Sequence, residues 1–231
     1  MSIMAAIAVP HPPLIIPAVG CGEEHGIEAT VASYRSVMAW AASFCPDTAV
    51  VLTPHSVMYR DYFHVSPGTH ARGDFSRFRA PQVAIESDYD TALAAAIAED
   101  AAAQGIPAGT MGEREAALDH GTMIPLYFLN EYLSDYKLVR IGLSGLDALT
   151  HYRLGKCIRS AAERLGRRVL IIASGDLSHK LKSNGPYGFA EEGPQFDALV
   201  TAALRAGDFE ALLSFDEGFC ERAAECGLRS F

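Results

Sequence analysis

Three histidines of this chain, His11, His55 and His179, each lie within six residues of the end of an apolar run of strand length. Imidazole binds zinc, copper and iron, and it is also the side chain best suited to proton transfer near neutral pH. A metal or acid–base site needs such side chains to converge from distant parts of the chain. The three equivalent positions therefore predict a metal or proton-transfer site, although any one of these histidines alone would be read as an ordinary loop residue.

Prolines adjoin the first two of these histidines. Pro10 and Pro12 flank His11, and Pro54 precedes His55. Proline restricts its own backbone and that of the residue before it. An imidazole held on such a backbone loses little entropy when it binds a metal, so we expect His11 and His55 to be metal ligands.

A fourth candidate is His120, which stands in Asp119-His120-Gly121 just before a predicted helix. Asp119 is suited to cap the amino end of that helix. His120 would then lie near the positive end of the helix, where the neutral imidazole is favoured. This placement suits hydrogen bonding or proton transfer, and an exposed histidine in a capping loop is the alternative. The remaining histidines are expected to be structural or solvated: His25, His64, His70 and His151.

The elements that would position these residues alternate between strands and helices. Apolar runs predict strands at 3–9, 48–53, 58–65, 83–85, 137–143 and 169–173. Helical spacing and composition predict helices at 27–44, 89–104, 122–133, 149–165, 195–206, 209–214 and 219–226. We expect Pro125 in a first helical turn, Gly227 as a helix stop, and an irregular loop at 67–81. The pattern predicts one α/β domain over residues 1–231, with a central mixed or mostly parallel sheet and helices on both faces.

The whole-chain composition limits the classes of function. The chain has 231 residues, with 19 basic and 28 acidic side chains and a net charge of -9, and no run of lysine or arginine predicts nucleic-acid binding. Its five cysteines form no CxxC pair, which favours the reducing cytoplasm over a disulfide framework. The apolar amino terminus lacks a basic region and is too short to span a membrane, so it is read as a buried first strand and no membrane partner is expected.

Four segments together resemble the class III extradiol ring-cleaving dioxygenase superfamily (LigB-like). This superfamily includes the catalytic subunit of protocatechuate 4,5-dioxygenase, the DOPA dioxygenases and the Memo proteins. The segments occur in family order: Val9-Pro10-His11-Pro12-Pro13, Leu52-Thr53-Pro54-His55-Ser56, Leu118-Asp119-His120-Gly121-Thr122-Met123-Ile124-Pro125-Leu126 and Ser174-Gly175-Asp176-Leu177-Ser178-His179. An apolar strand usually follows in the family where this chain ends, so we expect a truncated or short member.

The resemblance implies a role for each of the four histidines. His11 and His55 would be two metal ligands, and His179 would be the acid–base residue. His120 would lie in the pocket and help to place substrate or oxygen. These roles imply an oxidoreductase that opens a catechol-type ring with O2 beside its two hydroxyl groups.

The third metal ligand is less clearly indicated. The resemblance implies a carboxylate late in the chain, which points to Glu225, whereas Memo-like members favour Cys226, and Glu221 is a third candidate. On the predicted helix, Glu225 and Cys226 would point about 100° apart, so only one would face the metal. We prefer Glu225, because two histidines and one carboxylate leave open positions on Fe(II), whereas a thiolate would shift the preference toward zinc or copper.

The sequence thus predicts a cytoplasmic, homo-oligomeric, Fe(II)-dependent extradiol dioxygenase that acts on an aromatic diol and O2. We expect Tyr59 and Arg60 to contact the side group of the substrate, with Arg60 paired to a carboxylate; an exposed strand arginine is the alternative. The first rival is a Memo-like metal-binding protein without ring cleavage. A zinc hydrolase with His179 as its base and a non-enzymatic partner domain are the others.

Overall fold

The computed structural model describes residues 2–112, 114 and 117–231. Its central sheet has four parallel strands in the order β1 (Ile3–Val9), β8 (Val169–Ser174), β2 (Thr48–Thr53) and β7 (Lys137–Gly142). All six residues of β2 are buried, as expected for an inner parallel strand that is covered on both faces. The predicted strands at 3–9, 48–53, 137–143 and 169–173 are confirmed to within one residue, and so is the mostly parallel sheet.

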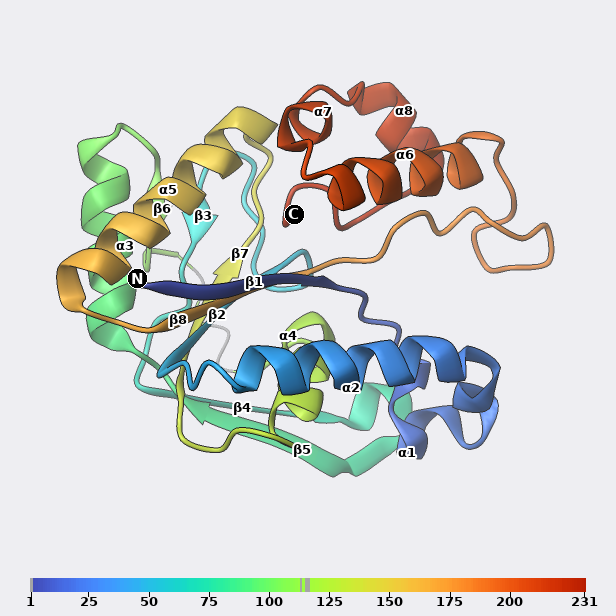
Figure 1. Cartoon of the computed structure of the whole chain (residues 1–231), viewed down its shortest axis with the longest axis horizontal. Coiled ribbons are helices and arrows are strands. Elements are labelled where there is room, and N and C mark those ends of the chain that lie inside the picture. The colour runs from blue at the N-terminus through green and yellow to red at the C-terminus, as the bar shows by residue number, and fades with distance from the viewer. Residues whose placement is uncertain (1, 113, 115–116) are drawn as a thin grey trace.

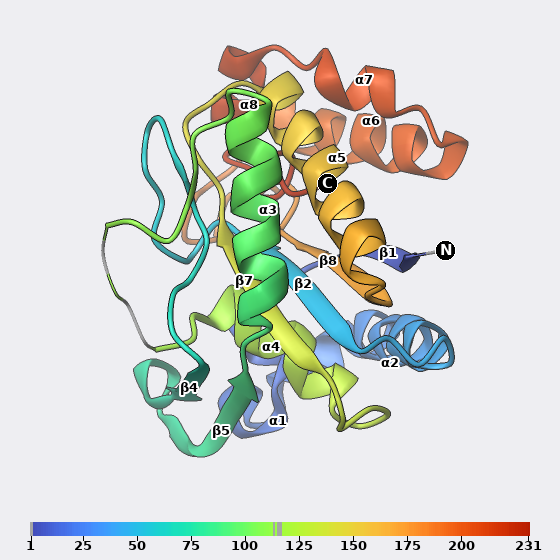
Figure 2. The same cartoon turned by 90° about the vertical axis from the view of Figure 1, so that its left-hand side faces the viewer.

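Helices cover both faces of this sheet (Figure 1). On one face lie α2 (Glu28–Ala42) and α4 (His120–Leu129), and on the other lie α3 (Thr91–Ala103) and α5 (Ala148–Leu165), which run side by side in Figure 2. The local sequence sets the ends of α5, because Asp147 accepts a hydrogen bond from the Thr150 amide and Gly166 adopts a φ of 64°. The predicted α/β class with helices on both faces is confirmed.

Three further helices form a layer of their own beside the carboxyl end of the sheet. They are α6 (Glu192–Ala206), α7 (Phe209–Leu213) and α8 (Glu217–Ala223), packed around Phe196 and Val200. Short helical turns near the amino terminus complete the fold: η1 (Pro13–Ile15), α1 (Pro17–Gly20) and η2 (Glu23–Ile27). No helix in the described part of the chain combines the length and apolarity needed to cross a membrane.

Residues 67–81 are not the irregular loop that the sequence predicts. They contribute to an antiparallel hairpin of β4 (His70–Phe75) and β5 (Ala80–Asp88), joined by the 3-10 turn η3 (Ser76–Phe78). The buried positions of β4 include Ala71 and Gly73, so its alternation carries little apolar signal. A Cβ atom on Gly73 would lie 2.6 Å from the Leu118 carbonyl oxygen, so glycine lets the hairpin approach the start of α4.

Three other predicted boundaries are wrong. The predicted strand at 58–65 is reduced to β3 (Phe63–His64), which pairs with β6 (Ala108–Gly109). Helix α4 begins at His120, so Pro125 lies inside the helix and not in its first turn. Helix α8 ends at Ala223, before Gly227, because Ala224 adopts a left-handed φ of 52°. Glu225 and Cys226 are therefore not helical.

Candidate metal centre

The carboxyl ends of β1 and β2 bring the first two predicted ligands together. His11 is only 1% exposed, whereas His55 is exposed at the edge of the site. The Nε2 atoms of the two imidazoles lie 3.0 Å apart. Because parallel strands deliver their carboxyl ends to the same edge of a sheet, residues that are distant in sequence meet here.

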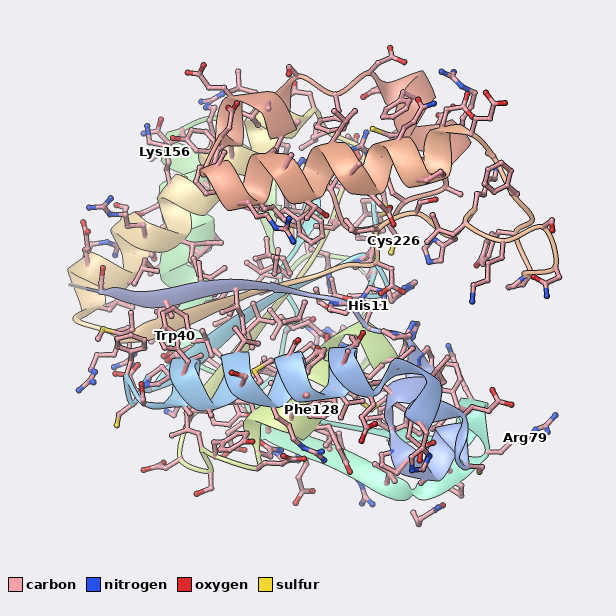
Figure 3. The ribbon with its side chains drawn as sticks, turned by 45° about the vertical axis from the view of Figure 1, so that its right-hand side comes forward. His11, Trp40, Arg79, Phe128, Lys156 and Cys226 are labelled. Carbon is pink, nitrogen blue, oxygen red and sulfur yellow. The ribbon has the colours of Figure 1, made fainter. Side chains whose placement is uncertain are left out.

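Cys226 completes a group of three potential ligands. Its Sγ atom lies 3.6 Å from His11 Nε2, and the three ligand atoms of His11, His55 and Cys226 all lie within 4.8 Å of one another. Figure 3 shows His11 at the end of β1 and Cys226 near it, on the side of the C-terminal helices. Metal–nitrogen and metal–sulfur bonds of about 2.1 and 2.3 Å place neighbouring ligands about 3–4 Å apart, so this donor set fits a single ion.

A backbone contact brings Cys226 to the end of β8. After the left-handed Ala224, the chain turns back, so that the Cys226 amide donates to the Asp176 carbonyl (3.3 Å) and the Asp176 amide donates to Cys226 Sγ (3.3 Å). A Cβ atom on Gly175 would lie 2.1 Å from the Gly227 Cα atom. Two glycines are therefore what allows these segments to touch.

The His11 ring is oriented by a hydroxyl group. Ser174 Oγ donates to the Gly121 carbonyl (2.6 Å) and lies 3.0 Å from His11 Nδ1. A hydroxyl has one hydrogen to give, so Ser174 accepts from His11 Nδ1–H, and His11 Nε2 keeps its lone pair for the site. Pro125 offers no N–H to the Gly121 carbonyl four residues earlier, which leaves that carbonyl for Ser174.

A buried carboxylate supports the His55 loop. The His55 amide donates to Thr53 Oγ1 (3.2 Å), and Thr53 Oγ1 donates to Asp119 Oδ1 (2.8 Å). Asp119 also caps α4, since its side chain accepts from the Thr122 amide, as the sequence predicts. Fully buried Arg140 lies 3.5 Å from the same carboxylate. The loop and the helix start are thus held by one acidic group.

Three imidazoles of the site, those of His11, His55 and His120, favour the neutral form. Burial lowers the pKa of His11 to about 4, against a partial opposing effect of Asp176. Burial, followed by the neighbouring His55 and His11, lowers the pKa of His120 to about 4, and burial also lowers the pKa of His55. His120 is the first residue of α4, and its ring centre lies 4.1 Å from that of His55. Neutral imidazole is the form that binds metal.

His179 lies beside this group and differs from it electrostatically. Its Nε2 atom is 3.6 Å from Asp176 Oδ2, and its Nδ1 atom donates to the Ala224 carbonyl (2.5 Å). The interaction with Asp176 raises the pKa of His179, although burial opposes the shift. Asp176, His179 and Cys226 form a second group whose potential ligand atoms lie within 4.8 Å of one another. His179 is therefore the basic imidazole of the site.

The preferred third ligand of the sequence, Glu225, takes another position. Its Oε2 atom accepts a hydrogen bond from the Leu228 amide (2.7 Å), and burial raises its pKa. Within residues 2–112, 114 and 117–231, neither Glu225 nor Glu221 belongs to a group of three potential metal ligands. Cys226 is the alternative prediction for the third ligand. The structure brings the Cys226 side chain, and not that of Glu225, to the two histidines.

Two cavities adjoin His55. The first, which we call the arginine cavity, has a volume of about 470 Å³ and is lined by His55, Arg72, Gly73, Asp74, Ser76, Arg77, Phe78, Ala117, Leu118, Asp119, His120 and Met123. The second, the acidic cavity, has a volume of about 640 Å³, and its lining includes His55, Cys226, Asp147, Glu217, Glu221, Glu225 and Arg229. Neither cavity is lined by Tyr59 or Arg60, which the sequence expects at the substrate.

Sequence reasoning missed Arg72 and Arg77, because they fall in the segment that it reads as irregular. Tyr59 instead pairs with Ser144 in an isolated bridge, and Arg60 is exposed. A polar–small alternation at 70–75 was the one signal that could have placed Arg72 on a strand.

The chain matches a known protein family over nearly its whole length. The family described as the catalytic LigB subunit of aromatic ring-opening dioxygenase matches residues 5–231. The chain belongs to this family. The resemblance predicted from the four histidine segments is thereby confirmed.

Three relatives show how the match extends. Protein CA_C1420 of Clostridium acetobutylicum is 37% identical over all of this chain, which spans 51% of that protein. The 3,4-dihydroxyphenylacetate 2,3-dioxygenase of Escherichia coli is 24% identical over 82% of this chain and 72% of its own. The 2,3-dihydroxyphenylpropionate/2,3-dihydroxicinnamic acid 1,2-dioxygenase of a Rhodococcus species is 28% identical over 76% of this chain and 56% of its own. The chain thus spans about half the length of the Clostridium protein.

Proposed function

We propose that this LigB-family chain is a metal-dependent oxidoreductase, with His11, His55 and Cys226 as the metal ligands. The observation that carries the proposal is the convergence of these three ligand atoms within 4.8 Å of one another. Cys226 replaces Glu225 as the proposed third ligand. A thiolate carries the same single negative charge as a carboxylate, so the set of two neutral imidazoles and one anion is kept. A soft thiolate by itself shifts the preference toward zinc or copper. Fe(II) remains the proposed metal because the proposed reaction uses O2, whereas zinc has no redox chemistry.

The proposed reaction is the opening of the ring of an aromatic diol by O2, beside its two hydroxyl groups. When bound, the metal would lower the pKa of a hydroxyl group of the diol and orient the ring. His179 would accept the proton of the other hydroxyl, and Asp176 stabilises the protonated imidazole that results. His120 is neutral and lies against His55, where it would donate a hydrogen bond to the substrate or to oxygen.

Two observations support this choice of reaction. The E. coli and Rhodococcus relatives are named as dioxygenases of dihydroxyphenyl acids. The site also contains both a basic imidazole, His179, and a neutral one, His120, which suits a reaction that must accept a proton at one atom and donate a hydrogen bond at another.

A second candidate is a metal-binding protein without ring cleavage, as in the Memo proteins. The position of Cys226 favours this candidate, because thiolate ligands prefer zinc or Cu(I) to the metals that are usually bound by oxygen ligands. In that case the three ligands would keep their roles, and His179 would have no substrate proton to accept.

The test begins with metal analysis of protein purified without oxygen, followed by oxygen uptake with 3,4-dihydroxyphenylacetate and simple catechols. We expect bound iron and diol-dependent uptake, and we expect His179→Ala to retain iron but lose uptake. Bound zinc or copper with no uptake would favour the second candidate. Full ring-cleavage activity in His179→Ala would refute the role given to this residue.

Three further expectations stay predictions. They are the cytoplasmic location, the homo-oligomeric state and the organisation of the protein as one domain. Size-exclusion chromatography with light scattering of the purified protein would measure the second directly.

A further inference from the structure

We propose that the arginine cavity binds an anionic group of the aromatic diol, most simply a carboxylate, through Arg72 and Arg77. The inference rests on the proposed function, because it concerns the substrate of that same centre. It replaces the sequence expectation that Arg60 would play this part.

The cavity connects the centre to the hairpin of β4 and β5. It is lined both by His55 and His120, which belong to the centre, and by Arg72 of β4 and Arg77 of η3. Its volume of about 470 Å³ falls in the range of about 300–1,000 Å³ that is typical of small-molecule sites. A single small ligand could therefore touch the centre and the two arginines at once.

Within the described part of the chain no ion pair engages either guanidinium group, although Glu86 is the cross-strand neighbour of Arg72. Among the described residues, neither Arg72 nor Arg77 has a carboxylate oxygen within the 4.0 Å of a salt bridge, and both side chains are exposed. A planar guanidinium can bind both oxygens of a carboxylate, and two of them on one wall form a site that attracts anions.

The two carboxylates that also line the cavity are already engaged. Asp74 accepts a hydrogen bond from the Ser76 amide (2.9 Å). Asp119 accepts from Thr53 and Thr122 and lies beside buried Arg140. Asp74 is close enough to Arg72 for an electrostatic effect, but it does not neutralise Arg77 by an ion pair.

The walls between these charged groups suit an aromatic ring. Phe78 and Met123 line the cavity, and the Phe78 ring stands edge-on to His120, with 5.3 Å between ring centres. Aromatic rings pack favourably in edge-to-face and offset arrangements, so a catechol ring could lie against this pair. Its diol would then face the centre, and its acidic side group would face the arginines.

The acidic cavity, which His55 also lines, is the other place where the side group of a diol could lie. Asp147, Glu217, Glu221 and Glu225 line it, with Arg229 as the basic residue among them. Arg229 is itself paired with Glu217 (3.3 Å). The rest of its wall is mostly apolar, and among the described residues it offers an acidic side group no arginine that is not already paired, so the arginine cavity is the better site for that group.

The test compares an acidic diol with a neutral one. In Arg72→Gln/Arg77→Gln we expect the KM for 3,4-dihydroxyphenylacetate to rise about 10- to 30-fold, and each single variant to give about threefold to tenfold, because exposed ion pairs are individually weak. The KM for 4-methylcatechol should change by less than about twofold, since it has no charge to lose. Arg79→Gln is the matched control: Arg79 is exposed, follows the same turn and points away from the body of the molecule (Figure 3).

A binding measurement separates failure of this inference from failure of the proposed function. Calorimetric titration of zinc-loaded protein with 3,4-dihydroxyphenylacetate should show affinity that falls in the double variant and is kept in Arg79→Gln. If that pattern holds but no diol supports oxygen uptake with iron, the proposed function fails and the arginine cavity stands. If acidic and neutral diols are used alike and the double variant changes neither KM nor affinity, the arginine cavity is refuted.

Discussion

The proposed ligands are held in two different ways. His11 and His55 follow strands of the central sheet, and their loops are fixed by buried groups such as Ser174 and Asp119. Cys226 follows a short helix outside the sheet and reaches the site through a turn at Ala224. We call these the strand-held and the turn-held parts of the site. The first depends on the core of the protein, whereas the second depends on one turn, on the hydrogen bonds between Cys226 and Asp176, and on one contact between glycines.

The two parts differ in how far they depend on the central sheet. The strand-held part cannot change without disturbing the parallel sheet, because its supporting hydrogen bonds come from β2, β8 and α4. The turn-held part lies outside these hydrogen bonds and presents two adjacent candidate ligands, Glu225 and Cys226, after the turn at Ala224. We therefore expect the turn-held part to decide which metal is preferred, and the strand-held part to decide whether any metal binds.

The largest expected effect is at the buried end of the strand-held part. His11→Ala should lower metal affinity by more than about 100-fold, because loss of an outer-shell partner alone costs about 10- to 100-fold. Affinity is measured by competition with a chelator of known strength. His25→Ala, at an exposed histidine that belongs to neither group of potential ligands, is the control and should bind as wild type does. Unchanged metal affinity in His11→Ala would show that His11 is not a metal ligand.

The next effect separates the two candidates of the turn-held part. Cys226→Ala should lower metal affinity by about 100-fold, because it removes a ligand and not only an outer-shell partner. Glu225→Gln should change it by less than about threefold, since the Glu225 carboxylate is engaged by the Leu228 amide. The same chelator competition, with iron and with zinc, measures both variants. The reverse order of the two losses would restore Glu225 as the third ligand.

A smaller effect is expected where a strand residue acts through a ligand. Ser174→Ala removes the acceptor for His11 Nδ1–H and should weaken metal binding about 10-fold. Ser33→Ala, at an exposed helical serine, controls for the loss of a hydroxyl. Thermal unfolding of both variants shows whether they are folded at the temperature of the assay. Wild-type affinity in folded Ser174→Ala would show that the hydroxyl does not orient the ring.

The smallest effect concerns the turn itself. Ala224 has a left-handed φ of 52°, a conformation that costs β-branched residues more than alanine. Ala224→Val should lower the free energy of unfolding by about 1–2 kcal/mol, while Ala224→Gly should change it by less than about 1 kcal/mol. Urea unfolding of the metal-free protein measures both. Equal stability of the valine variant would mean that the turn can relax.

The strand-held part could be predicted from the sequence, and the turn-held part could not. Buried parallel strands are continuous apolar runs, so 48–53 and 169–173 reveal where His55 and His179 must lie. The choice between Glu225 and Cys226 depends on where α8 ends. Alanine seldom ends a helix in the left-handed conformation, so Ala224 carried no signal, and the helix was extended too far.

The arginine cavity was missed for a related reason. Buried and exposed residues alternate along β4, but two of its buried residues, Ala71 and Gly73, are small. Gly73 must be small because it lies in close contact with Leu118. A strand is recognised in a sequence by the alternation of apolar and polar side chains, and Ala71 and Gly73 have little or no apolar side chain. Arg60 was preferred because it follows His55 closely in sequence, whereas Arg72 and Arg77 come near His55 only through the fold.

The central claim is that a thiolate and two imidazoles hold the metal. X-ray absorption spectroscopy of the zinc-loaded protein, with Glu225→Gln and Cys226→Ser beside it, tests this most directly. We predict one sulfur at about 2.3 Å and imidazole nitrogens at about 2.0–2.1 Å in the wild type and in Glu225→Gln, with the sulfur absent from Cys226→Ser. A wild-type spectrum with no sulfur neighbour, and a coordination shell that changes in Glu225→Gln, would contradict it.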